Sequence, residues 1–198
     1  MVGVVAMERM RDVMATTPQP PSPLMTATLR KDLSAVKVLL ANGANPYETT
    51  PPFSVPIVHS CSRENLDVTR VFLDSGFDPN WQGNEGIPVL AAMVQQGVLE
   101  CVALLIERGG NPNLRYPIRY RDSVPVLNRI RTEGNVPYER NVLHQAVVRG
   151  SLDIVELLLI KGAEPNVRDT NGETPLTWAK KTRRPDIVQA LANVGGTE

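Results

Sequence analysis

The stretch Val142-Leu143-His144-Gln145-Ala146-Val147-Val148-Arg149-Gly150-Ser151-Leu152-Asp153-Ile154-Val155-Glu156-Leu157-Leu158-Leu159 decides the fold of this chain. Two apolar runs flank Gly150. In the second run, Ile154, Val155 and the three closing leucines form a wide apolar stripe when placed on a helix. Gly162 then supplies the left-handed conformation that ends such a helix. The stretch therefore predicts two short antiparallel helices.

An apolar run followed by glycine occurs five times along the chain. The glycines lie at positions 43, 76, 109, 162 and 195, so the successive steps are 33, 33, 53 and 33 residues. Three equal steps indicate an internal repeat, and the long step is one period plus 20 residues. After four of these glycines comes a proline preceded by an acid or an amide, which keeps the chain extended because the residue before proline avoids helical angles. These dipeptides are Asn45-Pro46, Asp78-Pro79, Asn111-Pro112 and Glu164-Pro165.

Helix starts are also marked in the sequence. Ser22-Pro23 and Thr174-Pro175 each place a hydroxyl at an N-cap and a proline at the first helical position. A unit of two short helices and an extended link cannot bury its own apolar stripe, so the units must stack. We therefore expect an all-α solenoid of about five helix-turn-helix repeats over residues 22–198, with short hairpin-like links and one 20-residue insertion at about 114–140.

At these residues the chain resembles the ankyrin-repeat family. The period is 33, residues 142–159 are close to the family's helix pair, and residues 171–176 (Asn-Gly-Glu-Thr-Pro-Leu) are close to its repeat start. The family's mid-repeat glycine is present at Gly97 and Gly150, whereas Lys31, Glu64 and Arg183 replace it elsewhere. The resemblance implies a structural role for His144, which would bond backbone of the neighbouring repeat. It also implies recognition of partners through hairpin tips, first helices and the concave face.

Residues 1–21 do not continue the repeat. Met7, Met10, Val13 and Met14 fall at helical spacing, and prolines at 18, 20 and 21 end the pattern. A helix that caps the first repeat is the favoured interpretation, and a flexible tail or a binding helix remains open.

The insertion between Asn113 and Asn141 concentrates positive charge. Residues 115–140 hold six arginines against three acids, whereas the whole chain balances 21 basic against 21 acidic residues. Three of the four tyrosines also lie there. Arginine and tyrosine are enriched at interface hot spots, so we expect the insertion to contact a partner, with an ordinary solvated loop as the alternative. The basic run at 180–184 fits a polar outer face of the last repeat, or a nuclear-targeting patch.

The sequence offers little chemistry. Cys61 and Cys101, the only cysteines among 198 residues, are too few for a disulfide scaffold, and we expect buried, inert thiols. No phosphate loop or nucleophile elbow appears, and His59 is expected to be partly exposed. No apolar run is long enough to span a membrane. We expect no cofactor and no metal, and an intracellular protein, cytoplasmic or nuclear.

We conclude that the chain is a non-catalytic module that binds another protein, with no small-molecule substrate and no membrane contact. A nucleic-acid-binding accessory protein and an enzyme or enzyme subunit are the less favoured alternatives. For Tyr47 and Trp81, packing against the next hairpin competes with partner contact. The candidate contact residues are Tyr47, Trp81, Gln82, Arg115, Tyr116, Arg119, Tyr120, Arg121, Arg129, Arg131, Arg168 and Asp169.

Overall fold

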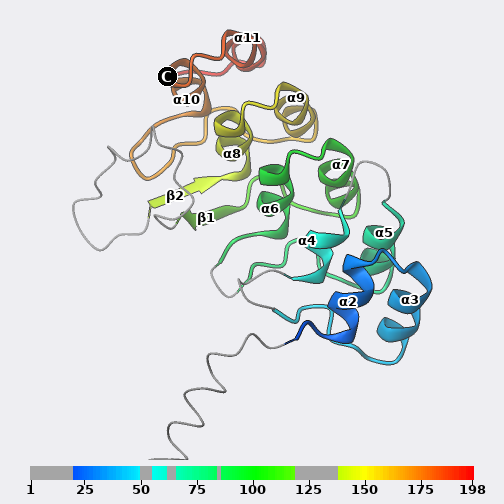
Figure 1. Ribbon diagram of the computed structural model, residues 1–198. Coiled ribbons are helices and arrows are strands. Elements are labelled where there is room, and N and C mark those ends of the chain that lie inside the picture. Colours follow the sequence, from blue (N-terminus) through cyan, green and yellow to red (C-terminus); the bar gives the residue numbers. More distant parts are fainter. Residues whose placement is uncertain (1–19, 50–54, 62–65, 84–85, 119–137) are drawn as a thin grey trace, which may run out of the picture.

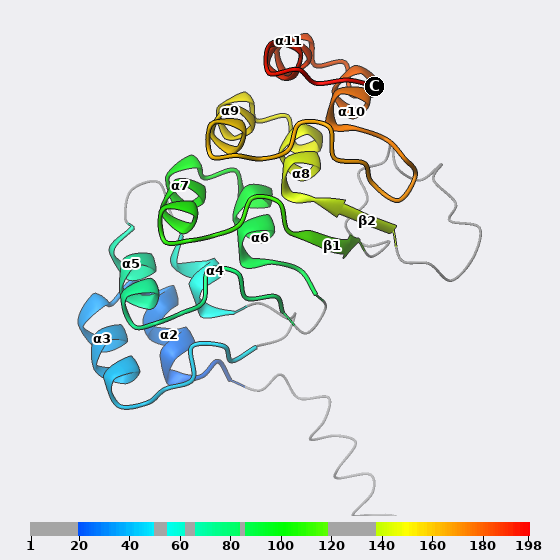
Figure 2. The ribbon, with the colours of Figure 1, turned by 180° about the vertical axis from the view of Figure 1, so that it is seen from behind.

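The computed structural model shows two curved rows of helices stacked along one axis (Figure 1). It describes residues 20–49, 55–61, 66–83, 86–118 and 138–198. The first helix of each repeat lies in an inner row and the second in an outer row, and the view from behind shows the same two layers (Figure 2). The links between repeats extend from the inner row, away from the outer one. The predicted helical solenoid is confirmed.

Each of the five repeats contributes one helix pair. The first-row helices are α2 (Pro23–Leu29), α4 (Pro56–Ser60), α6 (Val89–Gln96), α8 (Val142–Arg149) and α10 (Pro175–Lys181). The second-row helices are α3 (Leu33–Ala41), α5 (Asp67–Asp74), α7 (Leu99–Glu107), α9 (Leu152–Ile160) and α11 (Pro185–Asn193).

Helix ends follow the local signals in the sequence. The side chains of Ser22 and Thr174 accept hydrogen bonds from the backbone N–H groups of Met25 and Thr177, which confirms both N-caps. All five period-defining glycines adopt left-handed angles, with φ between 83° and 94°. At the mid-repeat position, Lys31 and Arg183 take the same left-handed turn at φ 56° that Gly97 and Gly150 take near 75°. Replacement of glycine there has not broken the helix pairs.

The apolar stripes meet between the two rows. Fully buried leucines and isoleucines come from every repeat, among them Leu24, Ile57, Leu105, Leu158 and Leu191. They belong to one continuous core that runs the length of the described stack. Burial of Leu158 confirms the helix register predicted for the fourth repeat.

Asparagines spaced by the repeat join each link to the next repeat. The Asn80 amide donates to the carbonyl of Gly109 (2.9 Å), and its Oδ1 accepts from the backbone N–H of Asn111 (2.7 Å). Asn113 and Asn166 make the same pair of bonds one repeat further on. The links are therefore tied to one another by side chains, although they contain little regular secondary structure.

The insertion leaves the stack through two short strands, which the helical prediction had not included. Strands β1 (Arg115–Ile118) and β2 (Tyr138–Asn141) pair antiparallel, with Arg115 opposite Asn141 and Tyr116 opposite Arg140. Below this two-stranded ribbon, α6 still packs on α8. Pairing of the chain segments at the base of the insertion lets 20 extra residues leave and return without separating the third and fourth repeats. The expectation of a capping helix or tail in residues 1–21 falls almost wholly outside the described residues.

The prediction of two inert thiols is wrong. Cys61 and Cys101 form a disulfide, with Cα atoms 6.0 Å apart across 40 residues of sequence. Cys61 follows α4 directly, and Cys101 lies in the first turns of α7, so the bond joins the second repeat to the third. Stacking brings the two positions within the distance that a disulfide requires, and their separation in sequence carried no sign of that contact.

Candidate functional site

The outward face of the ribbon carries charged side chains that also hold neighbouring links together. Arg115 is exposed and forms an ion pair with Glu139 on the opposite strand (Nε to Oε2, 3.7 Å). Its Nη1 donates to the backbone carbonyl of Arg168 in the next link (2.9 Å). Arg168 is exposed as well, and it donates to the carbonyls of Gly172 and Glu198. Both arginines lie at the surface, as predicted for contact residues, and both have structural bonds.

The face of the ribbon that turns toward α8 is buried. Tyr116 is only 5 % exposed, and its hydroxyl donates to Oε1 of Gln145 (3.3 Å). Arg140, its partner in the strand register, is 3 % exposed and donates from Nη2 to the same Gln145 oxygen. The tyrosine was predicted as a surface contact. The structure places it in the core instead, because strand alternation turns it toward the inner helix.

Asp169 also lies inside the molecule. Its carboxylate accepts from the indole Nε1 of Trp178 (2.8 Å) and from the backbone N–H groups of Asn171 and Glu173 (both 2.9 Å). At 5 % exposure the carboxylate shapes the link between the fourth and fifth repeats. Asp169 is therefore not available as the surface contact that the sequence suggested.

Tyr47 and Trp81 pack in an aromatic cluster with Phe77. The rings of Tyr47 and Phe77 stack with centroids 4.7 Å apart, and Trp81 lies 5.6 Å from Tyr47. The Tyr47 hydroxyl accepts from the backbone N–H of Asp78 (3.0 Å), which is the bond that Asn80 makes one repeat later. Tyr47 therefore packs against the next link, as the packing interpretation predicted, whereas Trp81 packs against the preceding link and Phe77. Gln82, next to Trp81, remains exposed.

The other five candidates, Arg119, Tyr120, Arg121, Arg129 and Arg131, lie outside the described residues.

His144 occupies the structural position that the family resemblance implied. Its Nε2 lies 3.1 Å from the carbonyl oxygen of Glu173 in the next repeat, and its Nδ1 lies 2.7 Å from Oδ1 of Asn141. A neutral imidazole carries one N–H and donates to only one of these oxygens. Burial of the ring lowers the pKa of His144 to about 4, against the opposing effects of the Glu173 carbonyl and the Asp169 charge. The neutral ring therefore connects two repeats at neutral pH.

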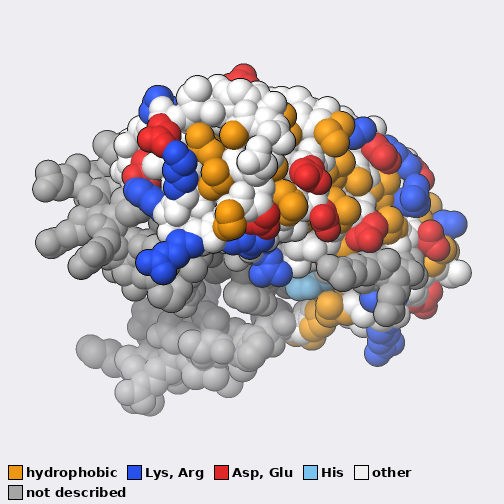
Figure 3. Space-filling view, turned by 90° about the horizontal axis from the view of Figure 1, so that it is seen from above, with side chains coloured by type: hydrophobic (Ala, Val, Ile, Leu, Met, Phe, Trp, Pro, Cys, Tyr) orange, Lys and Arg blue, Asp and Glu red, His pale blue; other side chains and the backbone are white. Residues whose placement is uncertain are grey.

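The basic run on the last repeat is largely paired with acids. Lys180 contacts Glu198, Lys181 contacts Glu173, and Arg184 forms a two-point pair with Asp186 at 3.2 and 2.9 Å. Acidic and basic side chains are also interspersed with apolar ones over the face seen in Figure 3. This pairing fits the polar outer face expected of a terminal repeat.

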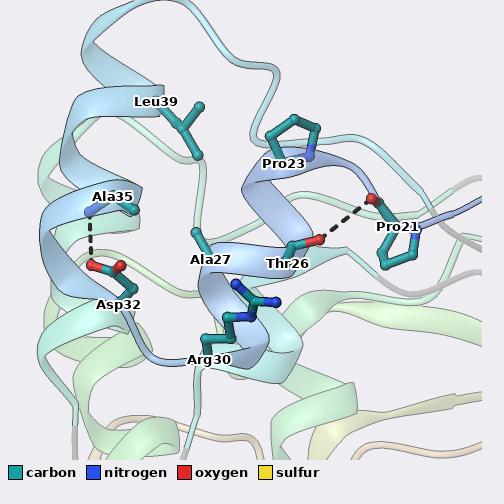
Figure 4. Close-up of a pocket in the computed structure, with 8 residues that line it drawn as sticks. All are labelled: Pro21, Pro23, Thr26, Ala27, Arg30, Asp32, Ala35 and Leu39. Atoms are coloured by element: carbon teal, nitrogen blue, oxygen red, sulfur yellow. Dashed lines mark hydrogen bonds between the residues drawn. The ribbon is translucent and has the colours of Figure 1, made fainter.

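An open, mostly apolar pocket of about 390 Å³ lies at the first repeat (Figure 4). Pro21, Pro23, Ala27, Ala35 and Leu39 line it between α2 and α3, with Arg30 and Asp32 at its edge. Nearby on the same two helices, Leu29 and Val38 are 53 % and 60 % exposed. The N-terminal end of the described stack thus leaves apolar surface uncovered.

Within the described ranges, no three His, Cys, Asp or Glu side chains gather in a way that could hold a metal ion. None of the described helices is long and apolar enough to cross a membrane.

Sequence reasoning missed two residues of this region, Arg140 and Gln145. Arg140 was counted only in the net charge of the insertion, and Gln145 only in the repeat pattern. Their one detectable signal was the repeat register: Arg140 directly precedes the N-cap Asn141, and Gln145 follows the buried His144 on the first helix. Nothing in the spacing showed that the ribbon would bring the two side chains together.

The paired helix rows, links and asparagine ties define a stacked helical-repeat protein. The sequence matches the family of ankyrin repeats, described as three copies, over residues 24–116 and 119–198. The chain therefore belongs to the ankyrin-repeat family. Ankyrin repeats generally mediate protein–protein interaction, and the family is typically a non-enzymatic interaction module.

Several known proteins are similar to parts of this chain. An ankyrin repeat-containing protein of Treponema pallidum (strain Nichols) is 31 % identical over 62 % of this chain and 35 % of its own length. The E3 ubiquitin-protein ligase KEG of Arabidopsis thaliana is 31 % identical over 57 % of this chain and 6 % of its own. A B-cell lymphoma 3 protein homolog of Mus musculus is 29 % identical over 55 % and 28 %. The matched region thus spans about a third or less of each of these relatives.

Proposed function

We propose that this protein is a non-catalytic binding module, and that it contacts a partner protein through its links and through the insertion between α7 and α8. The observation that carries the proposal is the ribbon. The ribbon holds both ends of the insertion on the side of the stack where the links lie, and α6 and α8 still pack on each other. A stack of this kind presents a rigid face, which loses little conformational entropy on binding.

Charge supports the same surface. Residues 115–140 carry a net charge of +3 in a chain whose total is zero, from six arginines against Asp122, Glu133 and Glu139. The described candidates Arg115, Arg168 and Gln82 are exposed along the links. The five candidates outside the described residues belong to the proposal on their sequence alone.

The proposal is tested by restoring the repeat period. Deleting residues 118–137 removes 20 residues and returns Gly109 and Gly162 to a spacing of 33. Because closing a longer loop costs only a logarithmic term, we expect the helical circular dichroism signal to be retained. Partners captured by the full chain and identified by mass spectrometry should bind the deletion variant at least about tenfold more weakly, a difference of about 1.4 kcal/mol.

A matched control removes exposed side chains from the other links, in the double variant Gln82→Ala/Arg168→Ala. Unchanged affinity of the deletion variant, together with lost affinity of this control, would contradict a role for the insertion and would place the contact on the neighbouring links.

A further inference from the structure

Within the part of the chain that the structure describes, Arg140 is a buried cation that no acidic side chain contacts. Among the residues that the structure describes, four buried side-chain atoms have no hydrogen-bond partner, and two of them are Nε and Nη1 of Arg140. A third is the amide Nδ2 of the adjacent Asn141. Three of the four are thus donors at the end of β2 for which the described residues supply no acceptor. The two unmet donors of the Arg140 guanidinium point to a missing anion.

The neighbours of Arg140 do not neutralise it. Tyr116 on the ribbon and Gln145 on α8 are uncharged, and of the guanidinium nitrogens the Gln145 oxygen accepts from Nη2 alone. The nearby acids have other partners: Glu139 pairs with Arg115, and Asp169 accepts from Trp178 and two backbone N–H groups. Leaving a buried guanidinium uncompensated is costly, whereas replacing such a charge by an apolar side chain of similar size often stabilises the fold.

We propose that Arg140 is the anchor for a carboxylate of an acidic segment in the partner protein. The partner's Asp or Glu side chain enters between the ribbon and α8 and accepts from the guanidinium, which the Tyr116–Gln145 pair holds in place. This inference rests on the proposed function and names the chemistry of the partner. A carboxylate is favoured over a nucleic-acid phosphate because the donors belong to one enclosed arginine, whereas backbone phosphates are met by rows of exposed cations.

The test observes the Arg140 side chain in the full-length chain by NMR. Hexaglutamate with blocked ends is the probe, and hexaglutamine is the matched neutral peptide. We expect the Arg140 Nε–H signal to shift on addition of hexaglutamate and not of hexaglutamine. In Arg140→Met the affinity for hexaglutamate should fall about 10- to 100-fold, the range expected for lost charge-assisted bonds. The control is Arg108→Met, which removes an exposed arginine at the end of α7 that pairs with Asp74, and it should change the affinity less than about threefold.

Stability gives an independent signature. If Arg140 is retained for binding, Arg140→Met should melt a few degrees higher than the natural chain, since it removes an uncompensated buried charge. Should Arg140→Met melt lower, and Glu173→Gln melt lower with it, the guanidinium is already paired inside the protein with Glu173, whose Oε2 is the fourth unpartnered atom. That result overturns the proposal. Arg140→Lys keeps the positive charge and serves as the variant for the hexaglutamate titration if Arg140→Met does not fold.

Two further outcomes also overturn it: equal affinity of the natural chain and Arg140→Met for hexaglutamate, and a stronger shift of the Arg140 signal with a single-stranded oligonucleotide than with the peptide. Failure of the proposed function is a separate result, because it is read from partner capture by the 118–137 deletion, which uses neither the peptide nor the Arg140 variants.

Discussion

At the scale of single residues, the repeat assigns the same place to different side chains and so allows their roles to be compared. Tyr47 occupies the repeat position that Asn80 occupies one repeat later. Its hydroxyl accepts a hydrogen bond from the backbone N–H of Asp78, which corresponds to the N–H of Asn111 that Asn80 binds. Asp169 stands where the insertion repeat has Tyr116, and both side chains are buried. For these two pairs of equivalent positions, the place in the repeat determines burial and hydrogen bonding although the residue types differ.

His144 makes the stability of the fold dependent on pH. Its pKa is lowered to about 4 in the folded protein, from 6.5 when unfolded, so between these values the unfolded chain binds a proton that the folded chain does not. Stability from the neutral ring is present above pH 6.5 and is lost as pH falls toward 4. We expect the unfolding free energy to drop by about 2 kcal/mol more from pH 7 to pH 5 in the natural chain than in His144→Gln.

Urea denaturation at the two pH values measures this difference. The exposed His59→Gln is the matched control and should keep the pH dependence of the natural chain. A natural chain that gains stability at pH 5 relative to His144→Gln would show instead that the Asn141 and Glu173 oxygens stabilise the imidazolium.

Gly150 and Arg183 test the left-handed turn between the paired helices in opposite directions. Both have positive φ, at 76° and 56°, and they occupy the same position of successive repeats. A left-handed conformation costs a residue with a side chain roughly 1–2 kcal/mol. We therefore expect Gly150→Ala to lose about 1 kcal/mol, since its Cβ would also overlap the Arg184 guanidinium. Arg183→Gly should gain roughly 0.5–1 kcal/mol, because glycine's greater freedom in the unfolded chain offsets part of the relief.

Chemical unfolding of the two variants measures both changes. Equal signs for the two substitutions would contradict the conformational explanation.

At the scale of helices and links, side-chain hydrogen bonds and one disulfide join neighbouring repeats. Asn113 reaches across the insertion to the Gly162 carbonyl and the Glu164 N–H, and these bonds keep the fourth repeat in register with the third. The Cys61–Cys101 disulfide adds a covalent tie between α4 and α7.

The disulfide should stabilise the second and third repeats. In the chain-entropy description, closing a loop of 40 residues restrains the unfolded chain by up to about 4 kcal/mol. We expect a thiol reductant to lower the thermal midpoint of the natural chain, and Cys61→Ser to show that lower midpoint with or without reductant. A midpoint that reductant leaves unchanged, in protein whose thiols are shown to be blocked before treatment, would contradict the prediction.

At the scale of the whole molecule, a stack needs its two ends covered. The C-terminal repeat carries paired charges on its outer face, and Val194 near its end is 48 % exposed. The N-terminal end instead leaves Leu29, Val38 and the lining of the Figure 4 pocket open. An apolar end is a weak point because each repeat depends on its neighbours for burial.

We expect residues 1–19, whose sequence carries a helical stripe of methionine and valine, to cover this end. Replacing Met7, Met10, Val13 and Met14 together by serine should lower the unfolding free energy by roughly 1–3 kcal/mol through lost apolar burial. The charge variant Glu8→Gln/Arg9→Gln is the control and should change little. Equal thermal midpoints for all three chains would show that the segment does not cap the stack.

The sequence by itself determined the repeat, its period, the helix pairs, the caps and the ankyrin fold. These features follow from local physics, because an apolar stripe, a capping hydroxyl or a left-handed glycine acts within one helix turn and is repeated in each unit. The repeat register placed Leu158 correctly, and the family resemblance implied the role of His144.

Only the tertiary structure decided which residues meet across repeats. Three features depend on distances between segments far apart in the sequence. They are the disulfide between Cys61 and Cys101, the burial of Tyr116 and Asp169, and the burial of Arg140 without an acidic partner among the described residues. A strand that slips by one residue would turn Tyr116 and Arg140 to the opposite face. The pairing that prevents this slip is made by the opposite strand and the next link, and no local pattern encodes it.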